Sequence, residues 1–145
     1  MERNWTGAVA GGLLGTLVMT AIGLWVAPIM GIPRMNPADM LAGAMGGSTL
    51  LGWAGHLMVG MILALVYAVV ATRLKGPPPV RGAVYGLAPW ILAMVVVTPM
   101  MGMPVFGGAA ATAMGSLIGH LAYGAVLGAV YGLPDVARHA APARA

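Results

Sequence analysis

The sequence predicts an all-α membrane protein, because it combines very few charges, long uncharged apolar runs and an internal repeat. Apolar residues make up 60% of the 145 residues and charged residues only 7%, whereas a soluble domain carries roughly 25% charged residues. Uncharged runs occupy residues 4–33, 40–72 and 82–134. Since about 20 apolar residues span a bilayer, the first two runs predict one transmembrane helix each and the third predicts two.

The basic residues predict the orientation of these helices. Of the 7 lysines and arginines, only Arg34 lies outside the N-terminus, the central linker and the C-terminus. Basic residues collect on the cytoplasmic side of membrane proteins, and an even number of spans places these three regions on one side. We therefore expect both termini in the cytoplasm. No basic stripe is present, so nucleic acid is not an expected partner; the lipid bilayer is.

Two segments of the chain repeat one another. The segment at residues 55–68 reads GHLMVGMILALVYA, and the segment at residues 119–132 reads GHLAYGAVLGAVYG. Upstream matches pair GAVAG with GAVYG and APIMGIP with TPMMGMP. The repeat predicts two duplicated hairpins, residues 1–72 and 80–134, that insert in parallel. They would form a single domain, residues 1–134, and the remaining residues 135–145 read as a disordered cytoplasmic tail.

The first half is longer than the second, and part of the extra sequence predicts a short helix at the outer surface near residues 36–45. Asn36 is a favourable N-cap, Pro37 suits the first helical position, and Asp39 favours the positive end of a helix. The expected role of Asp39 is therefore capping rather than catalysis.

Glycines predict how the spans pack. Helices in lipid associate through small residues that let their backbones approach closely, and the chain has 23 glycines. The positions expected at helix–helix contacts are Gly11, Gly15, Gly60, Gly124 and Gly128.

Several of these motifs resemble a known family. They are Gly52-Trp-Ala-Gly-His56, Gly86-Leu-Ala-Pro-Trp90 and Gly119-His120-Leu-x-x-Gly124, and together with the repeat they resemble a bacterial family of small four-span integral membrane proteins of unassigned function. The resemblance implies the four-span architecture and a bacterial cytoplasmic (inner) membrane. It implies no active site.

Each repeated segment carries a buried polar stripe. His56, Gly60 and Tyr67 fall on one helical face, and so do His120, Gly124 and Tyr131. Because an ionisable group facing lipid is costly, both stripes should face the interior, with Tyr67 and Tyr131 as interior polar groups. The simplest interpretation is structural: neutral imidazoles that hydrogen-bond across helices. The expected partners are Thr16, Thr20, Thr98 or a backbone carbonyl.

Two cofactors are alternatives to that structural interpretation. Imidazole and thioether are ligands for Cu(I), which makes a copper site possible with the candidate ligands His56, His120, Met58, Met30 and Met101. A haem b with two axial histidines is the second alternative, although only Arg34 is available for propionates.

The sequence favours no enzyme class, since paired carboxylates and nucleophile motifs are missing from the spans. The absence of cysteine also excludes disulfides and thiolate metal sites. We expect a non-enzymatic accessory or structural component of a membrane assembly, with other membrane proteins or a second copy as partners. A small-solute transporter or channel, formed as an oligomer, is a further alternative.

Overall fold

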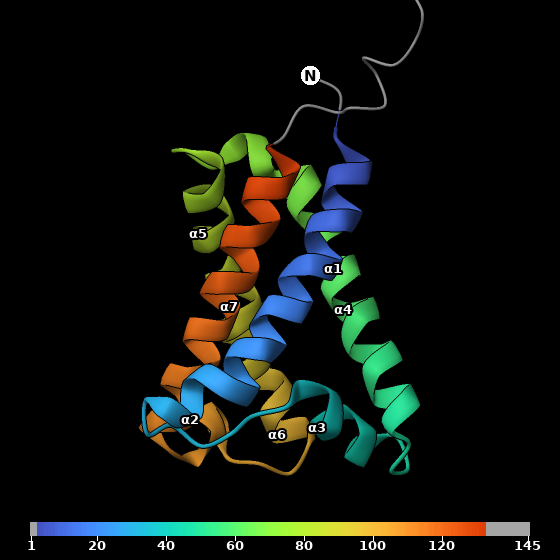
Figure 1. Ribbon diagram of the computed structural model, residues 1–145, viewed down its shortest axis with the longest axis vertical. Coiled ribbons are helices and arrows are strands. Elements are labelled where there is room, and N and C mark those ends of the chain that lie inside the picture. Colours follow the sequence, from blue (N-terminus) through green and yellow to red (C-terminus); the bar gives the residue numbers. More distant parts are fainter. Residues whose placement is uncertain (1–2, 133–145) are drawn as a thin grey trace, which may run out of the picture.

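The computed structural model describes residues 3–132, and these residues form helices joined by loops (Figure 1). Four helices are long and apolar enough to cross a membrane: Trp5–Ile29, Thr49–Arg73, Pro78–Met100 and Ala110–Tyr131. The predicted all-α architecture, with four helices long and apolar enough to span a membrane, is therefore confirmed. The predicted tail at residues 135–145 lies outside the described residues.

The first and third spans share an irregularity. In the first span, α1 (Trp5–Ala21) passes into a π-helical segment, Ile22–Val26, before the short α2 (Ala27–Ile29). In the third span, α5 (Pro78–Leu92) passes into the π-helical segment Ala93–Val97 before α6 (Thr98–Met100). A proline ring clashes with the carbonyl four residues earlier. The wider π turn relieves that clash ahead of Pro28 and Pro99.

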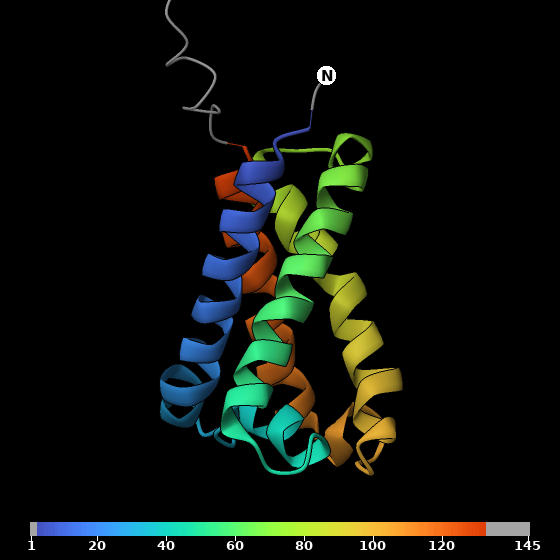
Figure 2. The same cartoon turned by 90° about the vertical axis from the view of Figure 1, so that its right-hand side faces the viewer.

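The helix α7 (Ala110–Tyr131) is central to the bundle. It packs against both α1 and α5, and α1 also packs against α4 (Thr49–Val70), whereas α4 and α5 have only sparse contacts with each other. Figures 1 and 2 show the resulting order α4, α1, α7, α5. The spans therefore surround a space that is least closed between α4 and α5.

Glycines lie where the helices approach most closely. A Cβ atom built on Gly11 would lie 3.1 Å from Leu127 Cδ1, and one on Gly15 would lie 2.7 Å from the carbonyl oxygen of Tyr123. Corresponding contacts face Gly60 (Thr16 Cβ, 3.1 Å), Gly124 (Gly82 C, 2.7 Å) and Gly128 (Gly82 Cα, 3.0 Å). All five glycines named from the sequence thus stand at contacts between spans, where a side chain would push the backbones apart.

The two ends of the bundle differ. The start of α1, the linker between α4 and α5, and the end of α7 lie at one end (Figure 1); we call it the basic end, for Arg3, Arg73, Lys75 and Arg81. The other end carries α2, α6 and the predicted short helix, which is present as α3 (Pro37–Ala44). Asn36 caps α3 as expected, since its Oδ1 accepts the backbone N–H of Ala38 at 3.1 Å.

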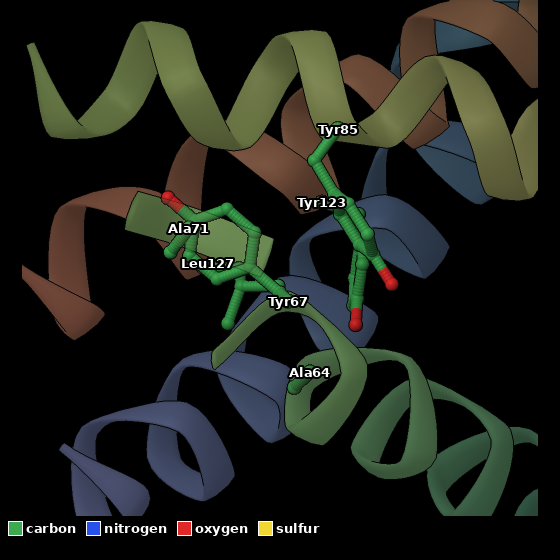
Figure 3. Close-up of a cluster of buried hydrophobic side chains, with 6 residues drawn as sticks. All are labelled: Ala64, Tyr67, Ala71, Tyr85, Tyr123 and Leu127. Carbon is green, nitrogen blue, oxygen red and sulfur yellow. The ribbon is translucent and has the colours of Figure 1, made fainter. Parts of the chain in front are cut away.

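Near the basic end, the core is a cluster of small and aromatic side chains (Figure 3). Its members come from α4, α5, α7 and the turn that follows α4: Ala64, Tyr67, Ala71, Tyr85, Tyr123 and Leu127. Large apolar side chains such as Ile29 (86% exposed) and Leu50 (79% exposed) face outward, as expected of surfaces that contact lipid.

Candidate functional site

A cavity of about 710 Å³ lies between the four spans, in the half of the bundle toward α3. All four spans contribute to its wall, which is mainly apolar. The polar side chains from the spans that line it are Thr16, His56, Thr98, Thr112, Ser116, His120 and Tyr123. The two histidines that the repeat singled out therefore belong to one site.

The segment before α3 and α3 itself cover this cavity at the end of the bundle opposite the basic end. Residues 33–37 and 39–41 contribute to the wall. The segment is tied to the first span, because the backbone N–H of Met35 donates to the carbonyl oxygen of Gly23 at 3.0 Å. Gly23 lies in the π-helical segment. Helix α3 in turn packs on α4, where a Cβ on Gly52 would lie 2.8 Å from Ala42 Cβ.

His56 forms a hydrogen bond between two spans. Its Nε2 lies 3.0 Å from Thr20 Oγ1. The Thr20 hydroxyl donates its own proton to the carbonyl oxygen of Thr16 at 2.8 Å, so at His56 it accepts. His56 Nε2 therefore carries a hydrogen and donates it, and the lone pair of the neutral ring is on Nδ1. Thr20 was one of the partners expected from the sequence.

His120 is oriented differently, by its own helix. Its Nδ1 lies 2.8 Å from the carbonyl oxygen of Ser116, one turn earlier in α7. A carbonyl only accepts, so Nδ1 donates and the lone pair is on Nε2. A hydrogen bond on one ring nitrogen fixes the tautomer and leaves the other free to bind a ligand. The two histidines thus have opposite tautomers, and each keeps one unprotonated nitrogen that has no hydrogen bond within residues 3–132.

Methionines gather around the same cavity. Six of the 13 methionines line it: Met19, Met35, Met40, Met94, Met101 and Met103. Among the candidate ligands named from the sequence, the structure brings together His56, His120 and Met101 only. Met30 (57% exposed) and Met58 (53% exposed) do not line the cavity. Met58 lies two residues after His56, about 200° around the helix, which predicts its outward position.

Charged groups occur only at the rim of the cavity. Arg34 and Asp39 line its outer edge, and both are exposed. Within residues 3–132, no group of three or more histidine, cysteine, aspartate or glutamate side chains could hold a metal ion. The soft donors that line the cavity are the two imidazoles and the thioethers of the six methionines.

Tyrosines close the cavity on the side of the basic end. Tyr123 donates to the carbonyl oxygen of Gly60 at 2.6 Å, and Tyr85 donates to that of Leu63 at 2.7 Å. Both carbonyls belong to α4, so these bonds link α5 and α7 to it. Of the two interior tyrosines named from the sequence, Tyr131 is half-buried and donates to Ala68 at 3.4 Å, whereas Tyr67 is fully buried.

One comparison with known proteins gives a match. A protein family described as a family of unknown function, DUF6789, matches residues 2–140. Comparison with curated proteins and with solved structures gives no match.

Proposed function

Because the chain belongs to the DUF6789 family of unknown function, we propose a function from its geometry: it binds a Cu(I) ion in the cavity between its spans. In this proposal it is a non-enzymatic accessory protein of the bacterial cytoplasmic membrane, with both termini in the cytoplasm. It holds the ion for a larger membrane assembly.

One observation carries this proposal. Two unprotonated imidazole nitrogens, His56 Nδ1 and His120 Nε2, belong to residues that line a cavity also lined by six methionines. Both ligand types are neutral, and thioethers favour soft ions such as Cu(I) over zinc or iron. A monovalent ion also carries less charge into a low-dielectric site than a divalent one.

The hydrogen bonds of the histidines support metal binding further. Histidines that ligate metals usually donate their second N–H to a carboxylate, a carbonyl or water, which fixes the ring and its tautomer. His120 donates to the Ser116 carbonyl, and His56 donates to a hydroxyl that is itself held by a carbonyl. Both rings are oriented before an ion arrives.

A haem b with two axial histidines is supported less well. Axial ligation of haem uses Nε2, and in His56 that atom is the donor to Thr20. Only Arg34 at the cavity rim offers a cation to the propionates. A channel or transporter has no specific observation in its favour.

The proposal includes duplication of two parallel hairpins. Two π-helical segments, Ile22–Val26 and Ala93–Val97, precede the matching prolines Pro28 and Pro99, and this supports a common origin of the first and third spans. For the orientation, the support is the gathering of Arg3, Arg73, Lys75 and Arg81 at one end.

The test is a titration of the purified full-length protein in detergent with Cu(I), in competition with the chromogenic chelator bicinchoninate. We expect one ion per chain, and His56→Ala and His120→Ala should each weaken binding at least tenfold. Met58→Leu is the matched control, because Met58 lies outside the cavity. A wild-type protein that takes no copper from the chelator would overturn the proposal, and a Soret band in the purified protein would favour haem.

A further inference from the structure

Two buried polar atoms at the basic end have no hydrogen-bond partner within residues 3–132. They are the hydroxyl oxygen of Tyr67 and Nε of Arg81. Buried polar groups in native proteins nearly always have a partner, and leaving one unpaired destabilises the fold, more so when it is charged. The described part of the chain offers no acceptor, which points to a partner from outside it.

Tyr67 differs from the other tyrosines in the direction of its hydroxyl. Its ring packs edge-on against Tyr85 (5.2 Å between centroids) and Tyr131 (5.4 Å) and is fully buried. Figure 3 shows the Tyr67 hydroxyl directed toward Ala71, away from the hydroxyls of Tyr85 and Tyr123. The hydroxyl is therefore directed to the place where α4 ends.

Arg81 approaches the same place from the first turns of α5. One of its terminal nitrogens, Nη1, donates to the carbonyl oxygen of Ala71 at 3.5 Å, a long contact. Ala71 lies one helical turn after Tyr67, so the guanidinium and the hydroxyl meet the same turn of α4. Arg81 as a whole is half-buried, although its Nε is buried.

The chemistry of these groups identifies the class of ligand. Both unpaired groups can donate, and one of them is cationic, so together they select an anionic acceptor. Arginine binds phosphate through two parallel N–H groups. Arg73 and Lys75, which are exposed in the adjacent linker, raise the positive charge at this end, where lipid phosphates lie at the boundary of the hydrocarbon region.

We propose that the phosphate of an anionic phospholipid binds between α4 and α5 at the basic end, held by Arg81 and Tyr67. Few residues of α4 and α5 lie close together, and at this turn they are joined by the long bond from Arg81 to Ala71, so the headgroup enters where that bond opens. Binding replaces the long contact from Arg81 to Ala71 with charge-assisted hydrogen bonds. This site lies at the opposite end of the bundle from the cavity and does not depend on copper.

The experiment measures thermal unfolding of the full-length protein in detergent, without added lipid and with phosphatidylglycerol, phosphatidylcholine or inorganic phosphate. We expect phosphatidylglycerol to raise the Tm of the wild type and phosphatidylcholine to raise it much less. Tyr67→Phe should reduce the shift by at least half, and Arg81→Gln should abolish it. Arg34→Gln, which removes a cation at the other end, should leave the shift unchanged.

Two further outcomes test the source of the phosphate and the role of the Tyr67 hydroxyl. A shift of equal size with inorganic phosphate supports the phosphate site but identifies a soluble ligand as its source. If Tyr67→Phe is more stable than the wild type in every condition and responds normally to phosphatidylglycerol, the hydroxyl is simply an unpaired group and the proposal is wrong. Tyr67→Phe removes a single oxygen atom, so this arm remains informative if Arg81→Gln fails to fold.

Discussion

The two halves of the bundle, one toward the basic end and one toward α3, are built from the same glycine-rich helices but are filled in different ways. Toward the basic end, tyrosines occupy the space between the spans, and two of them donate to carbonyls of α4 at 2.6 and 2.7 Å. Toward α3, unbranched methionines and two histidines surround an open volume of about 710 Å³. Rigid aromatic rings close one half, and flexible, polarisable side chains leave the other available to a ligand.

The two histidines also differ from each other, in the hydrogen bonds that orient their rings. They occupy matching positions of the repeat, yet His56 is held by a hydroxyl from another span and His120 by a carbonyl of its own helix. Equal sequence positions therefore present different ring nitrogens to the cavity. A site built from such a pair is asymmetric even though the two histidines lie in similar sequence segments.

The largest effect should come from closing the glycine contact between α5 and α7. In Gly82→Ala, the new Cβ would lie 2.7 Å from the backbone nitrogen of Gly128, so the helices must separate. We expect a loss of about 3 kcal/mol in the free energy of unfolding, measured by unfolding in mixed micelles. Gly43→Ala is the control, because Gly43 in α3 has nothing within 4 Å. An equal loss in both variants would contradict the assigned packing role.

The next effect concerns the hydrogen bond that orients His56. Thr20→Val keeps the shape of the side chain but removes the acceptor for His56 Nε2. Loss of such a supporting partner typically weakens metal binding 10–100-fold, and we expect about tenfold weaker Cu(I) binding in the chelator competition. Thr98→Val is the comparison, since Thr98 also lines the cavity but donates its hydroxyl to Met94 in its own span. Identical Cu(I) affinities for the two variants would show that Thr20 does not support the copper site.

A smaller effect is expected in the tyrosine-filled half. Tyr123→Phe removes the hydroxyl that donates to Gly60 at 2.6 Å, and hydrogen bonds between membrane helices contribute about 1 kcal/mol. The free energy of unfolding should fall by this amount, while Cu(I) affinity changes less than threefold. A large loss of copper binding with unchanged stability would show that Tyr123 belongs to the ligand site instead.

The smallest effect should appear at Met58. Its side chain is 53% exposed and does not line the cavity, so Met58→Leu is expected to alter stability by less than about 0.5 kcal/mol and to leave copper affinity unchanged. Met101→Leu, inside the cavity, should weaken copper binding severalfold. A larger loss of copper affinity in Met58→Leu than in Met101→Leu would show that the thioether ligand lies outside the cavity, on the outward face of α4.

Much of the fold could be predicted from local patterns. Long uncharged runs predicted the spans, and Asn36 with Pro37 predicted α3, because capping depends only on neighbouring residues. The interior position of both histidines followed from helical periodicity. The same periodicity argues against Met58 as a ligand, since 200° from His56 is nearly the opposite face of the helix.

The details of the site could not be predicted in the same way. Whether His56 meets Thr20 depends on the rotation and depth of two spans that are far apart in sequence. The cavity itself depends on which helix pairs touch, and the sequence does not reveal that α7 is central or that α4 and α5 are nearly separate. The hydrogen bond between Met35 and Gly23 could not be predicted either, because it depends on how the loop before α3 folds back onto the first span.

The sparse contact between α4 and α5 affects how the interior of the bundle can be reached from the lipid phase. Helices α5 and α7 touch through their glycines, and they cannot separate without losing this close backbone contact. Within residues 3–132, no glycine contact of this kind joins α4 and α5. Separating these two helices therefore costs the least free energy. Exchange with the surrounding acyl phase is therefore easiest along this side, and a hydrophobic carrier or a neighbouring membrane protein would approach the interior there without crossing water.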